Sequence, residues 1–153
     1  MSKTSENITV GLEVHAYLNV GKEGSKLFCD CPAQYKDAEP NVNVCPICTG
    51  MPGSKPMLPN RLAVEKVIAI GLLLGCEVQK KLVFQRKHYN YPDLPNGYQK
   101  TISGSYSTPV AVKGDYNGMG IWEVHLEEDP AKWDPRTGEV DYNRCGVPLI
   151  EIV

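Results

Sequence analysis

Four cysteines near the N-terminus constrain the fold of this chain more than any other feature of its sequence. They form two close pairs, Cys29-x-Cys31 and Cys45-x-x-Cys48, with thirteen residues between the pairs. This spacing is typical of a tetrahedral zinc site in which a tight turn supplies each pair of thiolates. The alternative is two disulfides, which require an oxidising compartment. Because residues 1–7 are polar and do not resemble a signal peptide, we favour zinc.

The composition predicts one globular domain over residues 1–153. A chain of this length can bury a core, and 42% of its residues are hydrophobic. A net charge of −2 argues against a nucleic-acid binder driven by electrostatics. The longest apolar stretch, residues 67–76, is too short to cross a bilayer. Without a signal peptide or a membrane span, we expect a cytoplasmic protein that makes no membrane contact.

Residues 8–18 show the clearest strand pattern. The even-numbered positions are all apolar, whereas the odd-numbered positions include Glu13 and His15. This alternation predicts a strand with one buried face, and it places Glu13 and His15 about 7 Å apart on the other face. Residues 19–60 are rich in Cys, Pro and Gly and lack periodicity. We expect a metal-stapled loop there, with a zinc-binding insertion over residues 25–50.

One helix is predicted over residues 62–74, which are almost all apolar. Asn60 can cap its start and Gly75 can stop it. With so few polar residues, we expect the helix to be buried on much of its surface against a sheet. Strands are expected over 78–84, 108–113, 120–126 and 147–153.

These elements predict an α+β fold with a mixed, mostly antiparallel sheet, one main buried helix and a zinc-bearing loop insertion. The last strand pattern runs to Val153 without a turn or polar tail. We therefore expect the chain to be truncated.

Several acidic residues lie within predicted strands, where burial of a carboxylate would be energetically unfavourable. Three acids, Glu127, Glu128 and Asp129, end the predicted strand that contains His125, and Glu151 lies among apolar residues. A buried carboxylate normally has a cation, a metal or water beside it, because burial without a partner is unfavourable. Gathered with Glu13 and His15 in one pocket, these acids would bind Mg²⁺ and suit phosphate chemistry. Taken singly, each also fits an ordinary solvated position.

A loop-like segment over residues 84–99 carries a second set of candidate binding residues. Its cations suit phosphate, and its tyrosines offer stacking faces and hydroxyls. The alternative is a surface loop braced by prolines, whose tyrosines cover the core. The candidates are Arg86, Lys87, Tyr89 and Tyr91.

Several motifs, taken in order, resemble one known family. They are Val10–His15, the two cysteine pairs, Arg86-Lys87 with Tyr91-Pro-Asp-Leu-Pro, His125–Asp129, and residues 140–153. Together they closely resemble the B-subunit family of the aspartyl/glutamyl-tRNA amidotransferases over residues 8–153. The resemblance implies the N-terminal part of the catalytic cradle domain, without the helical and tail domains that hold tRNA.

The resemblance also implies an activity. Such enzymes use ATP to phosphorylate the side-chain carboxylate of misacylated Glu-tRNA(Gln) or Asp-tRNA(Asn), and glutamine-derived ammonia then displaces the phosphate. Zn²⁺, Mg²⁺ and ATP are the implied cofactors and substrate. The implied partners are the amidotransferase A (glutaminase) and C subunits and the acceptor end of the misacylated tRNA. We expect no activity from this chain alone.

The resemblance assigns the site residues as follows. Glu13, His15, Glu127, Glu128 and Glu151 line the reaction site. Mg²⁺ is assigned to Glu13, Glu151 and Glu128, with Glu127 as the alternative to Glu128. His15 is a ligand or helps to deprotonate ammonia, and Lys87 contacts phosphate. Zinc is held by the quartet of Cys29, Cys31, Cys45 and Cys48.

A different class of function also fits the sequence, namely a non-catalytic zinc-bearing domain that binds RNA or protein. The acids discriminate between the two hypotheses. A pure RNA binder would avoid clustered carboxylates beside phosphate unless metal ions bridged them.

Overall fold

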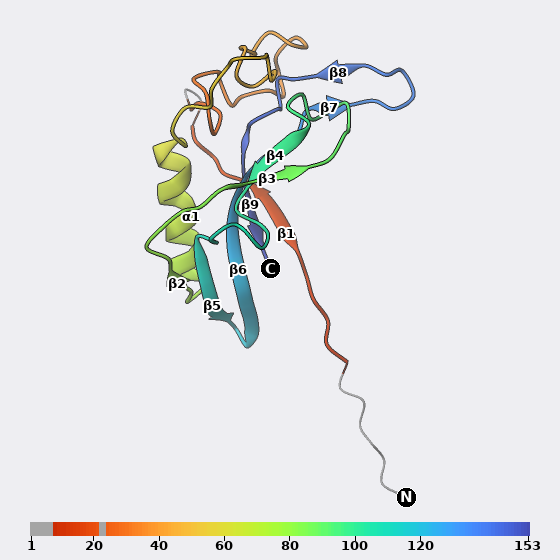
Figure 1. Cartoon of the computed structure of the whole chain (residues 1–153). Helices are drawn as coiled ribbons and strands as arrows, with labels where there is room; N and C mark the ends of the chain where they lie inside the picture. The colour runs from red at the N-terminus through yellow and green to blue at the C-terminus, as the bar shows by residue number, and fades with distance from the viewer. Residues whose placement is uncertain (1–7, 22–23) are drawn as a thin grey trace, which may run out of the picture.

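A computed structural model describes residues 8–21 and 24–153 of the chain, so the polar segment 1–7 lies outside the described residues. One seven-stranded sheet, in which every described pairing is antiparallel, carries a single described helix on one face (Figure 1). This confirms the α+β prediction. The elements are β1 (Val14–Tyr17), α1 (Arg61–Leu73), β2 (Glu77–Val78), β3 (Gln85–His88), β4 (Tyr98–Thr101), β5 (Ala111–Tyr116), β6 (Met119–Glu128), β7 (Lys132–Trp133), β8 (Val140–Asp141) and β9 (Pro148–Ile152).

The long strand β6 organises the sheet. It pairs with β5 through a hairpin and, further along, with β4, while β9 runs along its other edge. The hairpin turn is Asn117-Gly118, whose φ angles of 54° and 82° suit a two-residue turn with a left-handed backbone. Beyond these strands, β1 pairs with β9 and β3 pairs with β4. The result is three strands, β1, β9 and β6, side by side.

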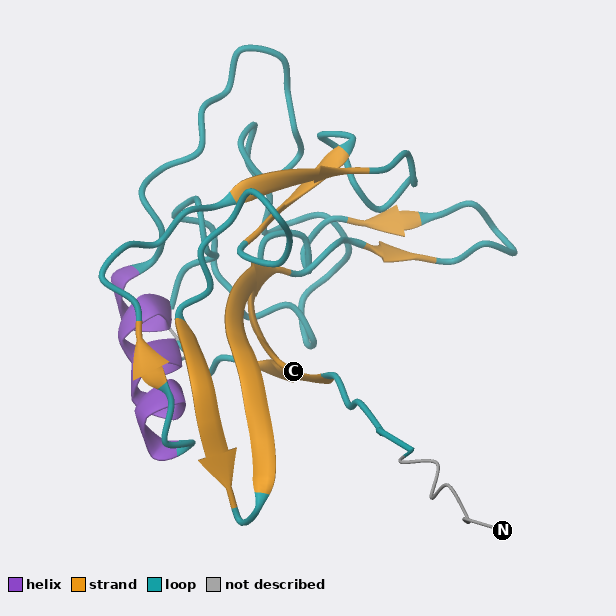
Figure 2. Cartoon of the chain, turned by 60° about the horizontal axis from the view of Figure 1, so that its bottom comes forward, coloured by secondary structure: helices purple, strands orange, loops and turns teal. Residues whose placement is uncertain are grey.

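The sheet has an apolar face and a polar face. Val124, Leu126 and Ile150 are buried in the core together with Ala63 and Val67 of α1. Figure 2 shows α1 beside β2 and the β5–β6 hairpin. Because side chains alternate along a strand, the residues between these core positions lie on the opposite face.

The helix begins and ends as predicted. The side chain of Asn60 accepts a hydrogen bond from the Ala63 amide at 3.1 Å, and Gly75 follows with a φ of 71°. The expected burial over much of its surface is wrong, because Leu73 is 79% exposed and only one stripe of α1 is buried. The reason is that α1 packs against a single face of the sheet.

The strand predicted over residues 8–18 is much shorter than expected. Only Val14–Tyr17 form β1, and the apolar side chains that were expected to be buried are exposed, by 87% at Ile8 and 78% at Val10. Val14 pairs with Ile152, the last residue of β9, so the pairing stops there. Alternation shows which side chains share a face, but it does not show what covers that face.

The other strand predictions were partly right. The elements β5, β6 and β9 overlap the predicted ranges within a few residues. The range 78–84 is wrong beyond Val78, where only an isolated bridge, Val83 to Thr108, joins the sheet. The hairpin of β3 and β4 was missed, because the Gln-Arg-Lys-His sequence of β3 has no apolar alternation.

Residues 25–50 contain no helix or strand, as expected for a loop insertion. This loop region lies at the same end of the molecule as β7 and β8 (Figure 1). Within the described residues, no helix is both long and apolar enough to cross a membrane.

Gly71 of α1 is buried against Ala111 of β5, and this contact leads to a testable prediction. A β-carbon at position 71 would lie 2.9 Å from that of Ala111. We expect Gly71→Ala to lower the free energy of unfolding by about 1 kcal/mol, because overpacking outweighs the better helix propensity of alanine. Urea denaturation measures the change.

The matched control is the double variant Gly71→Ala/Ala111→Gly, which returns the missing space at the contact. It should recover part of the lost stability. A single variant Gly71→Ala more stable than the parent chain would contradict this account of the contact.

Candidate functional site

The candidate site lies on the polar face of the sheet, across the three neighbouring strands β1, β9 and β6. The register places both His15 and His125 opposite Glu151. His15 Nε2 lies 2.9 Å from Glu151 Oε2, and His125 Nδ1 lies 2.6 Å from Glu151 Oε1. Each oxygen of this one carboxylate therefore has its own imidazole partner.

Glu127 joins this row from the next position on the same face of β6. Its carboxylate accepts hydrogen bonds from the Thr101 hydroxyl and, at 3.4 Å, from Gln99 Nε2. Ligand atoms of His15, Glu127 and Glu151 all lie within 4.8 Å of one another. We call these three residues the acid cluster.

The donor set of the acid cluster fits a divalent cation. Two carboxylates and one imidazole offer the hard oxygen ligands of Mg²⁺, with one nitrogen beside them. Burial raises the pKa of Glu127, the Thr101 hydrogen bond opposes that rise, and the negative charge of Glu151 adds to it. A cation between the carboxylates would offset both the burial and the repulsion.

Two predicted site residues do not join the acid cluster. Glu13 lies one residue before β1 and is exposed. Glu128 is the neighbour of Glu127 on β6, so its side chain lies on the opposite face. There its carboxylate lies 2.8 Å from Lys100 Nζ and accepts a hydrogen bond from the Lys100 amide. Strand alternation thus separates Glu127 from Glu128.

The sequence reasoning gave no role to His125, although the structure places it beside the acid cluster. It is 3% exposed, and its Nε2 lies 2.7 Å from Glu123 Oε2. A signal was present in the sequence, because His125 stands two positions before Glu127 on the same strand face.

Of the predicted phosphate and nucleotide contacts, Lys87, Tyr89 and Tyr91 lie near one another, whereas Arg86 lies on the other face. Lys87 pairs with Gln99 and therefore shares the face of Gln99, which hydrogen bonds to Glu127. Tyr89 also reaches Gln99, through a hydrogen bond from its hydroxyl at 3.3 Å. Arg86 pairs with Lys100 on the other face, and its guanidinium lies 5.1 Å from the centre of the Tyr98 ring.

The four predicted zinc ligands come together in the loop insertion. The sulfurs of Cys29, Cys31, Cys45 and Cys48 lie within 4.8 Å of one another, and all are free thiols. A hydrogen bond from Cys29 lowers the pKa of Cys48 to about 4 against the effect of burial, and Lys26 acts in the same direction. These thiols form a site that fits a metal ion and not a pair of disulfides.

Lys26 is a cation built into the wall of the cysteine site. Its side chain is almost completely buried. The ammonium donates to the carbonyls of Asn43 at 2.8 Å and Tyr142 at 3.1 Å, and to Cys48 Sγ at 3.4 Å. An ammonium has three donors, and all three are used here. The sequence reasoning missed this residue.

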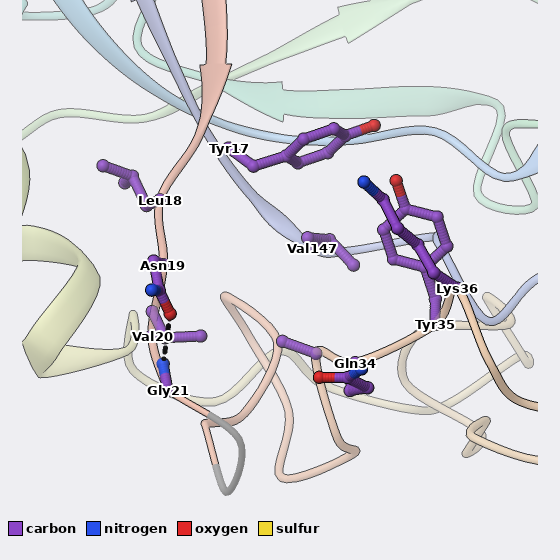
Figure 3. Close-up of a pocket in the computed structure, with 10 residues that line it drawn as sticks. Tyr17, Leu18, Asn19, Val20, Gly21, Gln34, Tyr35, Lys36 and Val147 are labelled. Carbon is purple, nitrogen blue, oxygen red and sulfur yellow. Dashed lines mark hydrogen bonds between the residues drawn. The ribbon is translucent and has the colours of Figure 1, made fainter.

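A cavity of about 250 Å³ lies between the end of β1 and the cysteine-bearing loop (Figure 3). Leu18 and Asn19 line one side of it, and Tyr35 lines the other. Tyr17 borders the same cavity, and its hydroxyl donates to Asp129 Oδ2 at 2.6 Å. No acid-cluster residue lines this cavity, although His15 lies two positions before Tyr17 on β1.

Comparison with known proteins identifies the family. The family model for the GatB/GatE catalytic domain matches residues 8–153. The chain belongs to this family. It is 55% identical over 149 residues to the B subunit of the aspartyl/glutamyl-tRNA(Asn/Gln) amidotransferase of Methanopyrus kandleri, and 56% identical over 145 residues to that of Methanocaldococcus jannaschii.

These two matches cover 96% and 94% of this GatB/GatE catalytic domain chain, but 31% and 29% of the relatives. The chain therefore spans less than a third of the length of the curated relatives that it matches.

The raised pKa of Glu127 predicts how the stability of a variant at this position should depend on pH. The pKa of Glu127 is higher in the folded chain than in the unfolded chain. The folded state therefore holds its proton more tightly, and ionisation above the folded pKa destabilises the fold. We expect Glu127→Gln to raise the free energy of unfolding near pH 8 in a chelator, because Gln still accepts from Thr101. The gain should shrink as the pH falls through the folded pKa towards 4.5.

Thermal unfolding at a series of pH values measures this effect. Glu77→Gln serves as the control, because the Glu77 side chain lies in an exposed surface pair with Lys113. An equal and pH-independent change in both variants would contradict the prediction.

Proposed function

We propose that this chain is the N-terminal part of the B subunit of a tRNA-dependent amidotransferase. The enzyme phosphorylates the side-chain carboxylate of misacylated Glu-tRNA(Gln) or Asp-tRNA(Asn) with ATP and amidates it with glutamine-derived ammonia. The observation that carries this proposal is the convergence of His15, Glu127 and Glu151 within 4.8 Å in a domain that matches the GatB/GatE family. Bringing a polyphosphate against a carboxylate requires such a cation site to offset the repulsion.

In this proposal His15, Glu127 and Glu151 would hold Mg²⁺, whose positive charge would offset the negative charge of the phosphoryl group. The two carboxylates are buried, whereas the side chain of His15 is 44% exposed. His15 is thus the acid-cluster residue best placed to contact substrate, either as a Mg²⁺ ligand or, in the alternative role, as a base that helps to deprotonate ammonia. Glu13 stays a candidate further ligand, because it lies two residues before His15 at the exposed end of β1.

The nucleotide and phosphate contacts are assigned by the same reasoning. Lys87 shares a face with Gln99 and is the preferred phosphate contact. Tyr89 is linked to the acid cluster by Gln99, which accepts a hydrogen bond from the Tyr89 hydroxyl and donates one to Glu127. Tyr91 packs against Tyr89 with ring centres 5.8 Å apart and extends this aromatic surface. For Glu128 we propose a structural role in the ion pair with Lys100. Arg86 stays a weaker candidate for phosphate binding, because it lies on the same face of the sheet as Lys100, opposite to the acid cluster.

We further propose that the cysteine quartet holds a structural Zn²⁺. Four thiolates close a tetrahedral site and leave no open position for substrate. The loop that carries them contains no helix or strand over residues 25–50, so bound metal would supply much of its folding energy.

The proposed partners are the A and C subunits and the acceptor end of tRNA, in the cytoplasm. The names of the relatives describe the B subunit of an amidotransferase and include tRNA. Exposed apolar side chains at Ile8, Val10 and Leu12 support contact with further protein.

The amidotransferase proposal is tested in the assembled enzyme that carries Glu151→Gln. We expect ATP-dependent amidation of misacylated tRNA to fall by about 100-fold or more, because a ligand carboxylate is lost. Glutaminase activity should persist, since it resides in a different polypeptide of the assembly. Glu77→Gln is the control, and amidation at the parent rate by Glu151→Gln would overturn the site assignment.

The zinc proposal is tested by metal analysis of the purified chain. We expect about one Zn²⁺ per chain, and its removal should loosen residues 25–50 before α1 in hydrogen exchange. Cys45→Ser should lose the metal, whereas Cys76→Ala, a buried cysteine outside the quartet, should keep it. A metal-free chain with unchanged protection would rule out a structural role.

A further inference from the structure

His125 is the least exposed histidine of the chain, and both its ring nitrogens face carboxylates. Nδ1 lies 2.6 Å from Glu151 Oε1, and Nε2 lies 2.7 Å from Glu123 Oε2. Its side chain is 3% exposed, so it does not contact substrate directly. The proposed reaction gives it no role.

We propose that His125 is a positioning residue that holds the Glu151 carboxylate in the orientation needed to bind the divalent cation. This inference rests on the proposed metal site of His15, Glu127 and Glu151. It predicts that the hydrogen bond from His125 to Glu151, and not merely the presence of a ring at position 125, sets the affinity of that site.

Two imidazoles restrain the orientation of the Glu151 carboxylate. The terminal torsion of a glutamate is broad, so an unrestrained carboxylate samples many orientations. His125 holds Oε1, and Oε2 is then directed at His15, 2.9 Å away. Oε1 is thus held by His125, while Oε2 faces His15, another member of the acid cluster.

The His125 ring is itself restrained by its strand and by Glu123. Its backbone is held by pairing on both sides, since Val124 pairs with Ala111 and with Ile152. The far nitrogen of the ring, Nε2, lies 2.7 Å from Glu123 Oε2. The ring is therefore restrained in position by the strand and in rotation by two carboxylates.

Hydrogen bonds to the side chain of a metal ligand contribute to the affinity for the metal. A hydrogen bond from behind to a metal-binding side chain removes rotational freedom before the ion arrives, and its loss typically costs 10- to 100-fold in metal affinity. Glu123, His125, Glu151 and His15 alternate carboxylate with imidazole across β6, β9 and β1. Each carboxylate in the row therefore faces an imidazole nitrogen.

Two amide substitutions separate positioning from mere core packing. The amide nitrogen of His125→Asn can occupy the place of Nδ1 and keep the donor to Glu151. The amide nitrogen of His125→Gln can occupy the place of Nε2 and keep only the contact with Glu123. Both variants are polar and smaller than histidine, so a purely structural role predicts similar losses for the two.

The experiment titrates the 153-residue chain with Mn²⁺ alone and follows free Mn²⁺ by electron paramagnetic resonance. We expect His125→Gln to bind about 10- to 100-fold more weakly than the parent chain. His125→Asn should stay within about threefold of the parent, because the donor to Glu151 is kept. The control is His88→Gln on β3, whose affinity should not change.

The outcomes distinguish this inference from the function on which it rests. A parent chain that binds no Mn²⁺ overturns the metal site, and the inference with it. A parent chain that binds, together with equal affinities for the His125→Asn and His125→Gln variants, overturns the inference alone.

Thermal unfolding in a chelator checks that both variants fold. If His125→Gln does not, Glu123→Ala replaces it, because that change removes the partner of the far nitrogen and leaves the ring in place. We then expect a loss of about threefold or more in Mn²⁺ affinity, and an unchanged affinity would overturn the proposal.

Discussion

The register of β9 between β1 and β6 is the constraint on which the rest of the structure depends. It places Glu151 opposite His15 on one side and His125 on the other. A slip of one residue would turn Glu151 towards the core and bring Ile150 to the polar face. Because one face is packed against α1 and the other carries the acids, that slip is costly on both faces. The register is therefore strongly specified.

The strand β6 joins the two candidate metal sites through its alternating side chains. Glu127 faces the acid cluster, whereas Glu128 faces Lys100 on the side of the cysteine loop. Within the loop, the buried ammonium of Lys26 donates to Cys48 Sγ and to the carbonyls of Asn43 and Tyr142.

Local signals in the sequence predicted the fold well where a residue acts on its own neighbours. Asn60 and Gly75 bound α1 as expected, because capping depends on adjacent backbone groups. The same reasoning failed for residues 8–13, whose burial depends on a partner strand far away in the sequence. It also missed β3, whose polar residues form a strand only because β4 pairs with them.

The sequence by itself determined which residues have the chemistry, namely the four cysteines, the acids and His15. It also determined the family, since ordered motifs over residues 8–153 carry that resemblance. Only the tertiary structure decided which of these side chains meet. It brought Glu127 to His15 and Glu151, turned Glu128 away, and placed His125 behind Glu151. The physical reason is that adjacent residues of a strand point to opposite faces, while strand pairing brings together residues more than a hundred positions apart.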